Sequence, residues 1–434
     1  MEKTDKEIKK TNEGEIFIFN DKSLASNYGI GTYMREYLYV LEQIDCSINL
    51  IELNSTQPTY SIKKDNIKHF YIPHSPNEIV NKKYYLNVIK LLRLYIDPIQ
   101  THIFHLNYEY ADFFVEELKL HFPNSRTIAT VHYSQWSWTV NGDHEKYYRM
   151  IQKSDFTDKF QYNHLIKCYT FSKKFYNKID RLIVLCKDTF ELLHEIYKLP
   201  QEKMILIPNG MRDLKKNLSP LEKQQLKKKY HLNKDEKIIL YVGRLQTSKG
   251  IQILLQAFTH ILNKYESYRL VIVGGGMDSD LKRTIEQSSD IGIKITFTGD
   301  ICQQLLFDWY QMADIGVLPS YLEQCSYVGI EMMMHQLAVV ASDAYGVRNM
   351  FKEDENALIA KIGERNNENE FIRNLTTRIV ELLTNEEKRE QIALYARNIY
   401  EDLYRIEKMT DAYLRFFNGL FKGSRTFTLK KANL

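Results

Sequence analysis

The stretch KIILYVGRLQTSKG, residues 237–250, decides the fold. Its run Ile238–Val242 predicts a buried strand, because it is short, apolar and bounded by glycine. Apolar residues then recur at helical spacing and predict a helix with one apolar stripe, made of Ile251, Leu254, Leu255, Phe258, Ile261 and Leu262. A strand, a glycine-containing turn and a helix in this order are typical of parallel α/β domains.

The same alternation of strand and helix extends over most of the chain. Runs that predict strands stand near Ile16–Phe19, Ile48–Leu53, His69–Ile72, Ile103–Leu106, Thr127–His132, Leu182–Leu185, Ile205–Pro208, Leu270–Val273, Ile295–Thr298, Ile315–Leu318 and Ala338–Ala341. Longer segments of helical period separate these runs. The sequence therefore predicts the α/β class, with two doubly wound domains.

A turn and a helix start separate the two halves. Pro208–Gly210 reads as a turn, and Ser219–Glu222 reads as a capping box in which the serine hydroxyl and the glutamate cap each other. A boundary near residues 211–218 follows. The predicted divisions are residues 1–212, residues 213–412 and a tail of residues 413–434, whose last part from Ser424 is basic.

Composition and charge exclude several classes of protein. The chain has 434 residues, enough for two hydrophobic cores, and its net charge of +4 is too small to imply a nucleic-acid partner. Its charged start, Met1–Asp5, predicts no secretory signal, and no apolar run is long enough for a transmembrane segment. Five scattered cysteines without metal-ligand spacing predict reduced thiols. We therefore expect a cytoplasmic protein.

Four predicted strands of the second half are each followed by a segment that contains glycine, a cationic side chain or a carboxylate. These strand-end segments are Gly243–Gly250, Gly274–Gly276, Gly299–Ile301 and Pro319–Glu323. Ligands of open parallel sheets bind outside the carboxyl ends of the strands, so the four segments are expected to face one crevice. Glycines such as Gly243 and Gly274 would let the backbone approach a ligand closely.

Two cations in the first of these segments suit a diphosphate. Arg244 offers a planar fork of donors, and Lys249 adds a point charge where the next helix begins. The helix N-terminus contributes free N–H groups and the positive end of its dipole. The alternative interpretation is ordinary surface charge at a helix start.

A pair of carboxylates follows the last of these segments. Glu323 and Glu331 stand eight positions apart, and a helix that starts near Ser326 would leave Glu323 in the loop above the crevice. Carboxylates accept hydrogen bonds from vicinal hydroxyls, and the N–H groups of Tyr327 and Val328 would point at phosphate. The alternative interpretation is a solvated helix with two ordinary glutamates.

The first half offers a glycine pair and a histidine. Gly29 and Gly31 stand between the first strand and the first helix, a suitable place for a backbone-lined phosphate or sugar site. His132 ends the strand Thr127–His132 at the same edge of its sheet. The alternative interpretation of His132 is a histidine that merely caps a strand.

These residues resemble the large retaining family of GT-B glycosyltransferases, often called group 1 or family four. The likeness is strongest from Lys237 to Gly346 and continues in register over the first half. The family hallmarks match Val242-Gly243-Arg244, Lys249-Gly250, Glu323 with Glu331, Pro208-Asn209-Gly210, Gly29 with Gly31, and His132. The resemblance implies two Rossmann-like domains facing each other across a cleft, with the C-terminal helix returning to the first domain.

The resemblance also implies roles for single residues. Arg244 and Lys249 would hold the donor diphosphate, and Glu331 would hold the ribose. Glu323 would contact the donor sugar, and His132 would meet the sugar near the reacting carbon.

Backbone groups complete the site that the resemblance implies. The backbone at Ile301 would border the base, and the backbone at Tyr327 and Val328 would meet phosphate. No divalent ion and no cofactor are expected, since the cations and helix ends already carry the charge of the leaving group. The sequence Asp278-Ser279-Asp280 imitates a metal-binding pattern but is expected to be a helix N-terminus.

Some positions depart from the family pattern. Ser326 replaces the usual glycine three residues after the first glutamate, and Asn349 replaces the glutamate of a Gly-Gly-x-x-Glu pattern that begins here at Tyr345. The run Glu331–Gln336 lacks the usual helix-ending glycine. Ser326 and Tyr345 are expected to narrow the sugar pocket, and Glu323–Ser326 resembles a subgroup of bacterial enzymes linked to peptide modification.

The resemblance implies a metal-independent, retaining hexosyltransferase that uses a nucleoside diphosphate sugar, with UDP as the expected nucleotide. Two other functions stay open, a nucleotide-sugar epimerase of the same fold and a degenerate transferase that serves as a binding scaffold. A dinucleotide oxidoreductase is excluded because its glycine fingerprint is absent.

The acceptor stays open among peptide, glycan and lipid-linked molecules. Its site is expected between Tyr133 and Tyr169, where Trp136 and Trp138 cluster. The alternative interpretation of that segment is an insertion that only packs over the domain edge. Contact of the basic amphipathic segment Lys82–Ile96 with a membrane surface stays open too.

Overall fold

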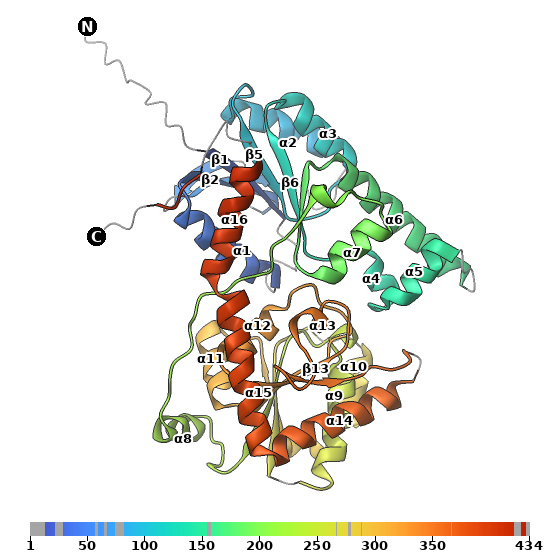
Figure 1. The fold of residues 1–434 in the computed structure, drawn as a ribbon, viewed down its shortest axis with the longest axis vertical. Helices are drawn as coiled ribbons and strands as arrows, with labels where there is room; N and C mark the ends of the chain where they lie inside the picture. Colours follow the sequence, from blue (N-terminus) through green and yellow to red (C-terminus); the bar gives the residue numbers. More distant parts are fainter. Residues whose placement is uncertain are drawn as a thin grey trace. The chain divides into compact units, whose positions relative to one another are not determined.

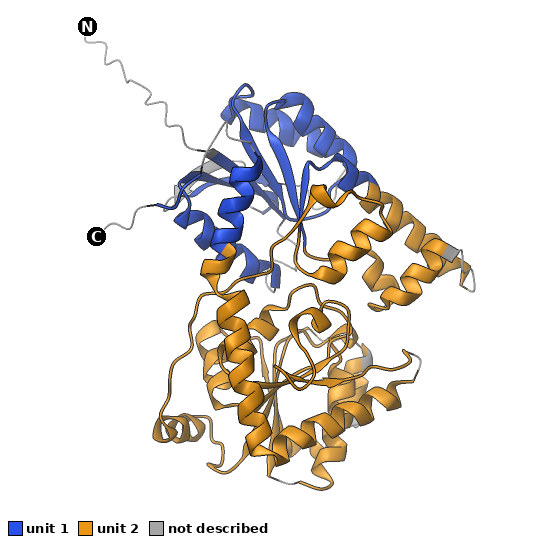
Figure 2. Cartoon of the chain, in the orientation of Figure 1, with its two compact units in different colours: residues 1–131, 174–183, 410–434 blue, residues 132–173, 184–409 orange. Residues whose placement is uncertain are grey.

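The computed structural model describes most of the chain in two compact units (Figure 2). It describes residues 14–21, 29–56, 60–64, 67–73, 82–153, 158–265, 267–276, 279–287, 289–365, 367–420 and 427–430. The first unit comprises residues 1–131, 174–183 and 410–434, and the second comprises residues 132–173 and 184–409. The two units are defined by contacts between residues, whereas the predicted division near residue 212 rests on a turn and a helix start in the sequence, so that division stays a prediction.

Among the described residues, eight strands form the first sheet, in the order β3-β4-β2-β1-β5-β6-β7-β8. Their bounds are β1 Gly14–Asp21, β2 Cys46–Ser55, β3 Tyr60–Lys64, β4 Ile67–Pro73, β5 His102–Leu106, β6 Arg126–Val131, β7 Arg181–Val184 and β8 Met204–Leu206. The central β1 is parallel to both β2 and β5, and the edge strand β3 is antiparallel to β4. The sequence did not predict β3.

The second sheet, in the part of the chain that the structure describes, has six strands in the order β11-β10-β9-β12-β13-β14. Their bounds are β9 Lys237–Val242, β10 Tyr268–Val273, β11 Ile295–Gly299, β12 Ile315–Leu318, β13 Ala338–Ser342 and β14 Leu358–Ala360. All the pairings are parallel. The central β9 is the strand predicted from the opening stretch, and the short edge strand β14 was not predicted.

Helices alternate with these strands along the chain (Figure 1). Those from the first half are α1 Gly29–Gln43, α2 Lys82–Tyr95, α3 Asp112–His121, α4 Trp136–Thr139, α5 His144–Lys153, α6 Lys159–Lys178 and α7 Lys187–Glu195. Those from the second half are α8 Pro220–Lys229, α9 Ile251–Leu262, α10 Ser279–Gln287, α11 Gln303–Met312, α12 Tyr327–Met334, α13 Val347–Met350, α14 Glu368–Thr384, α15 Glu386–Ile399 and α16 Ile406–Leu420. No helix in the described part of the chain is long and apolar enough to span a membrane.

Local sequence explains where two of these helices lie. The predicted capping box starts α8, because the Ser219 hydroxyl accepts from the Glu222 N–H at 3.3 Å while the Glu222 carboxylate accepts from the Ser219 N–H at 2.7 Å. The predicted stripe of α9 is buried at Ile251, Leu254 and Phe258, among others. Burial of an apolar face in this way provides most of a helix's stability in a folded domain.

Within the first unit, α16 packs on α1 through buried tyrosines. The Tyr413 hydroxyl lies 2.7 Å from the Tyr33 hydroxyl, and the Tyr413 ring packs 4.8 Å from that of Tyr37. Tyr37 also bonds to His105 of β5 at 2.7 Å. This buried polar network fixes the last long helix against the first.

Candidate active site

The glycine loops after β9 and β10 touch each other in the second unit. The N–H of Leu245 donates to the oxygen of Gly275 at 3.0 Å, and Gly274 adopts φ +132°. A Cβ at Gly274 would lie 2.0 Å from the backbone oxygen of Gly243, so no other residue fits there. The predicted site glycines thus have a packing role of their own.

The loop after β11 joins the same edge of the sheet. The N–H of Gly274 donates to the oxygen of Gly299 at 3.0 Å. Asp300 lies against Gly275, whose added Cβ would meet its carboxylate at 2.4 Å. Ile301 follows directly and is partly exposed. The structure therefore brings these three predicted strand-end segments together, and the fourth joins them where the N–H of Tyr321 donates to the oxygen of Ser248 at 2.9 Å.

The two predicted cations flank the start of α9. Lys249 ends a 3-10 turn, Thr247–Lys249, and Gly250 then takes φ +70° to lead into the helix. Arg244 is partly exposed, and its guanidinium carbon lies 6.0 Å from the centre of the Trp138 ring. The position of Lys249 at a helix start is as the sequence predicted.

Lys249 and Glu323 form an ion pair. The lysine Nζ donates to the Glu323 Oε1 at 2.7 Å, and the Ser320 hydroxyl donates to the same oxygen at 2.9 Å. Both charged side chains are mostly shielded from solvent. The residue predicted to hold diphosphate and the residue predicted to contact sugar are therefore adjacent, which no sequence pattern could establish.

Ser326 acts as the N-cap of α12. Its hydroxyl accepts from the Gly329 N–H at 3.3 Å, and its side chain is buried. The helix then starts at Tyr327, so Tyr327 and Val328 occupy its first turn. The interpretation of Ser326 as a group that narrows a pocket stays a prediction, but its hydroxyl is engaged with the helix.

Glu331 is buried one turn into α12. The hydroxyl of Tyr310, from α11, donates to its carboxylate at 2.8 Å. Burial and the nearby Glu331 raise the pKa of Tyr310, so the phenol stays protonated and remains a donor. No sequence pattern indicates Tyr310, since the contact joins residues of separate helices.

His132 directly follows β6, whereas the sequence predicted it as the last residue of that strand. Burial lowers its pKa to about 3, so the imidazole is neutral at physiological pH. A neutral imidazole can exchange hydrogen bonds with sugar hydroxyls but is a weak proton acceptor. Gly29 and Gly31 belong to the first unit, where they form the first turn of α1 rather than a loop before it.

The predicted acceptor segment contains one buried and one exposed tryptophan. Trp136 is 1% exposed and stacks on Tyr147 with ring centres 4.8 Å apart, whereas Trp138 is 61% exposed. Trp136 is therefore a core residue, because its ring is buried against Tyr147 of α5. The exposed Trp138 beside Arg244 retains the character expected of a ligand contact.

Arg365 ties this segment to the loop after β12. Its guanidinium donates to the backbone oxygen of Asn141 at 3.0 Å and to that of Tyr321 at 3.4 Å. Gly142 takes φ +72°, and an added Cβ would lie 2.5 Å from the Tyr321 oxygen. The turn after α4 therefore packs directly on the loop that carries Glu323.

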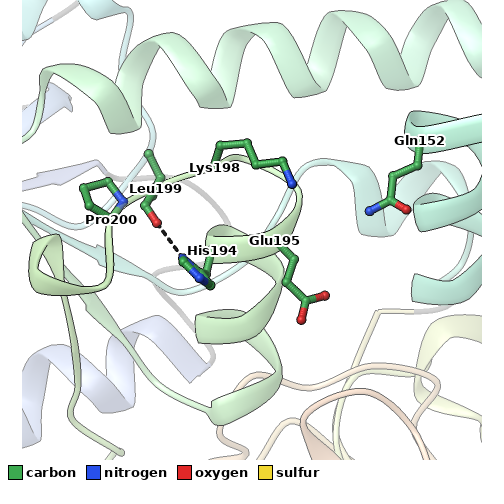
Figure 3. A pocket seen from close by; sticks show the side chains of 6 residues that line it. All are labelled: Gln152, His194, Glu195, Lys198, Leu199 and Pro200. Carbon is green, nitrogen blue, oxygen red and sulfur yellow. Dashed lines mark hydrogen bonds between the residues drawn. The ribbon is translucent and has the colours of Figure 1, made fainter.

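Two further features lie outside this cluster. A cavity of about 530 Å³ is lined by Gln152, which falls in the predicted acceptor segment, and by His194, Glu195, Lys198, Leu199 and Pro200, which belong to no predicted site (Figure 3). In the described part of the chain, no three His, Cys, Asp or Glu side chains gather as a metal ion would require. Ser279 starts α10 as expected, and Asp278 lies outside the described residues.

Comparison with known proteins gives two family matches. A model described as glycosyl transferases group 1 matches residues 222–399, and one described as glycosyltransferase family 4 matches residues 29–213. An uncharacterized glycosyltransferase of Methanocaldococcus jannaschii is 31% identical over 180 residues, 41% of this chain and 46% of that protein. Matches to the first curated relatives span 41–46% of their lengths.

Solved structures share the fold. Sucrose-phosphate synthase from Thermosynechococcus elongatus aligns with a TM-score of 0.72 at 21% identity, over 95% of this chain and 100% of that one. A protein of Anabaena solved in complex with UDP aligns with a TM-score of 0.65 at 14% identity, over 94% of this chain and 100% of that one. The predicted pair of Rossmann-like α/β domains, as in GT-B proteins, is confirmed.

Proposed function

Because the chain belongs to the group 1 glycosyltransferase family, we propose that it transfers a sugar from a nucleoside diphosphate sugar to an acceptor. The observation that supports this most is the 2.7 Å contact between Lys249 and Glu323 at the start of α9. It puts a cation suited to diphosphate beside a carboxylate suited to sugar hydroxyls. No contact among the described residues favours the epimerase or the scaffold.

UDP is the proposed nucleotide. The support is indirect, since the Anabaena protein of the same fold was solved with UDP. Glu331, oriented by Tyr310, is the proposed partner of the ribose hydroxyls. The strand-end backbone near Ile301 would border the base.

The proposed chemistry places positive charge where the diphosphate leaves. Arg244, Lys249 and the N-terminus of α12 would stabilise the negative charge that develops on the departing diphosphate. Groups that are held in place before the reaction stabilise such charge most effectively. We therefore propose that no metal ion is required. Retention of the anomeric configuration is part of the same proposal.

A reducing compartment such as the cytoplasm also belongs to the proposal. All five cysteines of the chain are free thiols, four of them buried.

Binding of the donor can be tested by thermal unfolding. A nucleotide at one hundred times its dissociation constant should stabilise the folded protein by about 2.7 kcal/mol, or roughly 5 °C. We expect UDP or a UDP-sugar to raise the melting temperature more than GDP, ADP and their sugars. If no nucleotide and no nucleotide sugar shifts the transition, the proposed function is wrong.

Trp138 is proposed as a contact of the acceptor. Its exposed ring beside Arg244 offers an apolar face next to the proposed diphosphate site. Trp138→Ala is expected to lower transfer about tenfold, since a stacked group is worth about 1–1.5 kcal/mol, while hydrolysis of the donor by water continues. The two rates are measured separately with the same labelled donor.

The control for this variant keeps the ring. Trp138→Phe should retain most of the transfer. Phe160→Ala removes another exposed aromatic side chain of the same region, and it should leave transfer unchanged. Trp136 is unsuitable, because removal of a buried tryptophan costs about 3–5 kcal/mol of stability. Equal losses of hydrolysis and transfer in Trp138→Ala would refute the assignment.

A further inference from the structure

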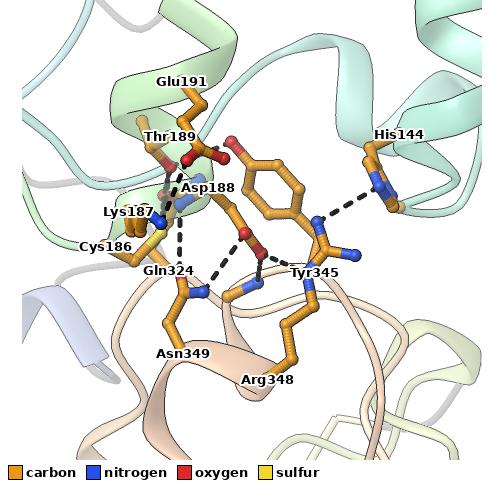
Figure 4. Close-up of polar contacts among 12 residues, drawn as sticks. His144, Cys186, Lys187, Asp188, Thr189, Glu191, Gln324, Tyr345, Arg348 and Asn349 are labelled. Carbon is orange, nitrogen blue, oxygen red and sulfur yellow. Dashed lines mark hydrogen bonds and ion pairs between the residues drawn. The ribbon is translucent and has the colours of Figure 1, made fainter.

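Asp188 has an unusually complete set of partners for a side chain outside the predicted site. It lies in the first turn of α7 and is 6% exposed. Its Oδ2 accepts from the Gly346 N–H at 2.8 Å and from the Arg348 Nε at 2.9 Å. Figure 4 shows the Asp188 side chain with Arg348 and Asn349. Its Oδ1 accepts from the Asn349 Nδ2 at 3.1 Å. A buried carboxylate is stable only with such compensation.

The contact between Asp188 and Asn349 is reciprocal. The Asn349 side chain donates to the carboxylate with its nitrogen, and its oxygen accepts from the Asp188 backbone N–H at 2.9 Å. An amide carries both a donor and an acceptor and can therefore make both bonds, whereas an ionised carboxylate only accepts. A carboxylate at residue 349, as in the family pattern, would face Asp188 with like charge and no proton to donate.

The loop that Asp188 holds is in turn attached to Glu323. The N–H of Glu323 donates to the backbone oxygen of Tyr345 at 3.1 Å. At Gly346, with φ +75°, an added Cβ would lie 1.9 Å from the backbone oxygen of Glu323. The two backbones are therefore in direct contact, and displacement of Gly346 would displace Glu323.

Thr189, the residue after Asp188 in α7, makes a second connection to the segments around Glu323. The Thr189 hydroxyl donates to the side-chain oxygen of Gln324, which directly follows Glu323. The Tyr345 hydroxyl donates to the same Thr189 hydroxyl at 3.0 Å. The first turn of α7 thus contacts both segments that meet at Glu323.

We propose that Asp188 is a positioning residue for Glu323, and that Asn349 is its matched partner. Asp188 acts through Gly346 and the loop 345–349, and it contacts neither sugar nor phosphate itself. The inference rests on the proposed function, in which Glu323 contacts the donor sugar. It explains why an amide stands at residue 349, where the family pattern has a carboxylate.

An exchange of the two side chains tests the pair without a change of shape. Asn349→Asp puts two carboxylates against each other, and we expect kcat for donor hydrolysis to fall at least tenfold. The double variant Asp188→Asn with Asn349→Asp restores one amide and one carboxylate, and it should recover most of the lost rate. The dissociation constant for UDP should change less than threefold in all variants, because Arg244 and Lys249 are untouched.

The controls separate positioning from loss of structure. Asn374→Asp changes an amide of α14 in the same unit and should leave kcat unchanged. Thermal unfolding of each variant shows whether it is folded. The variant Asp188→Asn is measured alone as well. If the fold-loss of kcat in the double variant equals the product of the fold-losses in Asp188→Asn and Asn349→Asp, or if Asn349→Asp keeps the wild-type kcat, the inference is overturned.

Failure of the inference differs from failure of the proposed function. If the wild type hydrolyses the donor but the variants show no coupling, only the role of Asp188 is wrong. If the wild type neither binds UDP nor hydrolyses any nucleotide sugar, both are wrong.

Discussion

Arg244→Ala is expected to weaken the binding of UDP at least tenfold. A charge-assisted hydrogen bond to phosphate contributes about 1.5–3 kcal/mol, which corresponds to about tenfold or more in affinity. Arg244 stands just after β9, in the glycine loop that packs against the loop after β10, and it is partly exposed. Calorimetric titration with UDP, GDP and ADP measures the effect on each nucleotide.

Lys249→Ala is expected to reduce both affinity and turnover. It removes a phosphate contact and also leaves Glu323 without the cation that lies 2.7 Å away. A shielded carboxylate that loses its partner is destabilised and is free to move. We therefore expect kcat to fall in this variant more than in Arg244→Ala.

The matched control is Lys229→Ala. Lys229 pairs with Asp308 at 3.0 Å on an exposed surface, where an ion pair contributes about 1 kcal/mol or less. UDP affinity should change less than about twofold, because the pair lies outside the predicted site. Unchanged affinity in both Arg244→Ala and Lys249→Ala would show that the diphosphate binds elsewhere.

The sequence predicted the parts of the fold that local rules control. The opening stretch predicted β9 and α9, because a short apolar run, glycines and a helical stripe each have one dominant structural meaning. The capping box at Ser219 was predicted for the same reason. The meeting of the glycine loops also followed, since parallel strands must end at one edge of a sheet.

The short edge strands could not be predicted. β3 and β14 contain only five and three residues, and their sequences have little periodicity. Such strands form because a neighbouring strand offers unpaired N–H and C=O groups, so their cause is tertiary.

Side-chain partners far apart in sequence were also beyond prediction. Asp188 and Asn349 are 161 positions apart, and nothing near either residue indicates the other. The sequence predicted the same acceptor role for Trp136 and Trp138, although the helical turn of α4 buries the first side chain and exposes the second. Both results depend on which segments pack together.

Transfer by this protein is expected to retain the anomeric configuration of the donor sugar. An inverting reaction needs a base that takes the acceptor proton on the face opposite the leaving group. With its pKa near 3, His132 is a poor base. Glu323 is engaged with Lys249 and Ser320. Attack on the face of the departing phosphate, which can accept the proton itself, is therefore expected.

The same reaction is expected to proceed without a divalent ion. In the proposed function, Arg244, Lys249 and the N-terminus of α12 would supply the positive charge that a metal would otherwise contribute. Addition of EDTA should therefore leave the rate of donor cleavage within about twofold of the untreated enzyme.

One measurement tests these expectations together. Proton NMR follows the sugar released from UDP-sugars by the wild-type protein in EDTA, with water as acceptor, before the free sugar equilibrates. The account predicts UDP release, and a first-formed sugar with the anomeric coupling of the donor. A first-formed sugar of inverted configuration, or cleavage that begins only when magnesium or manganese is added, would contradict it.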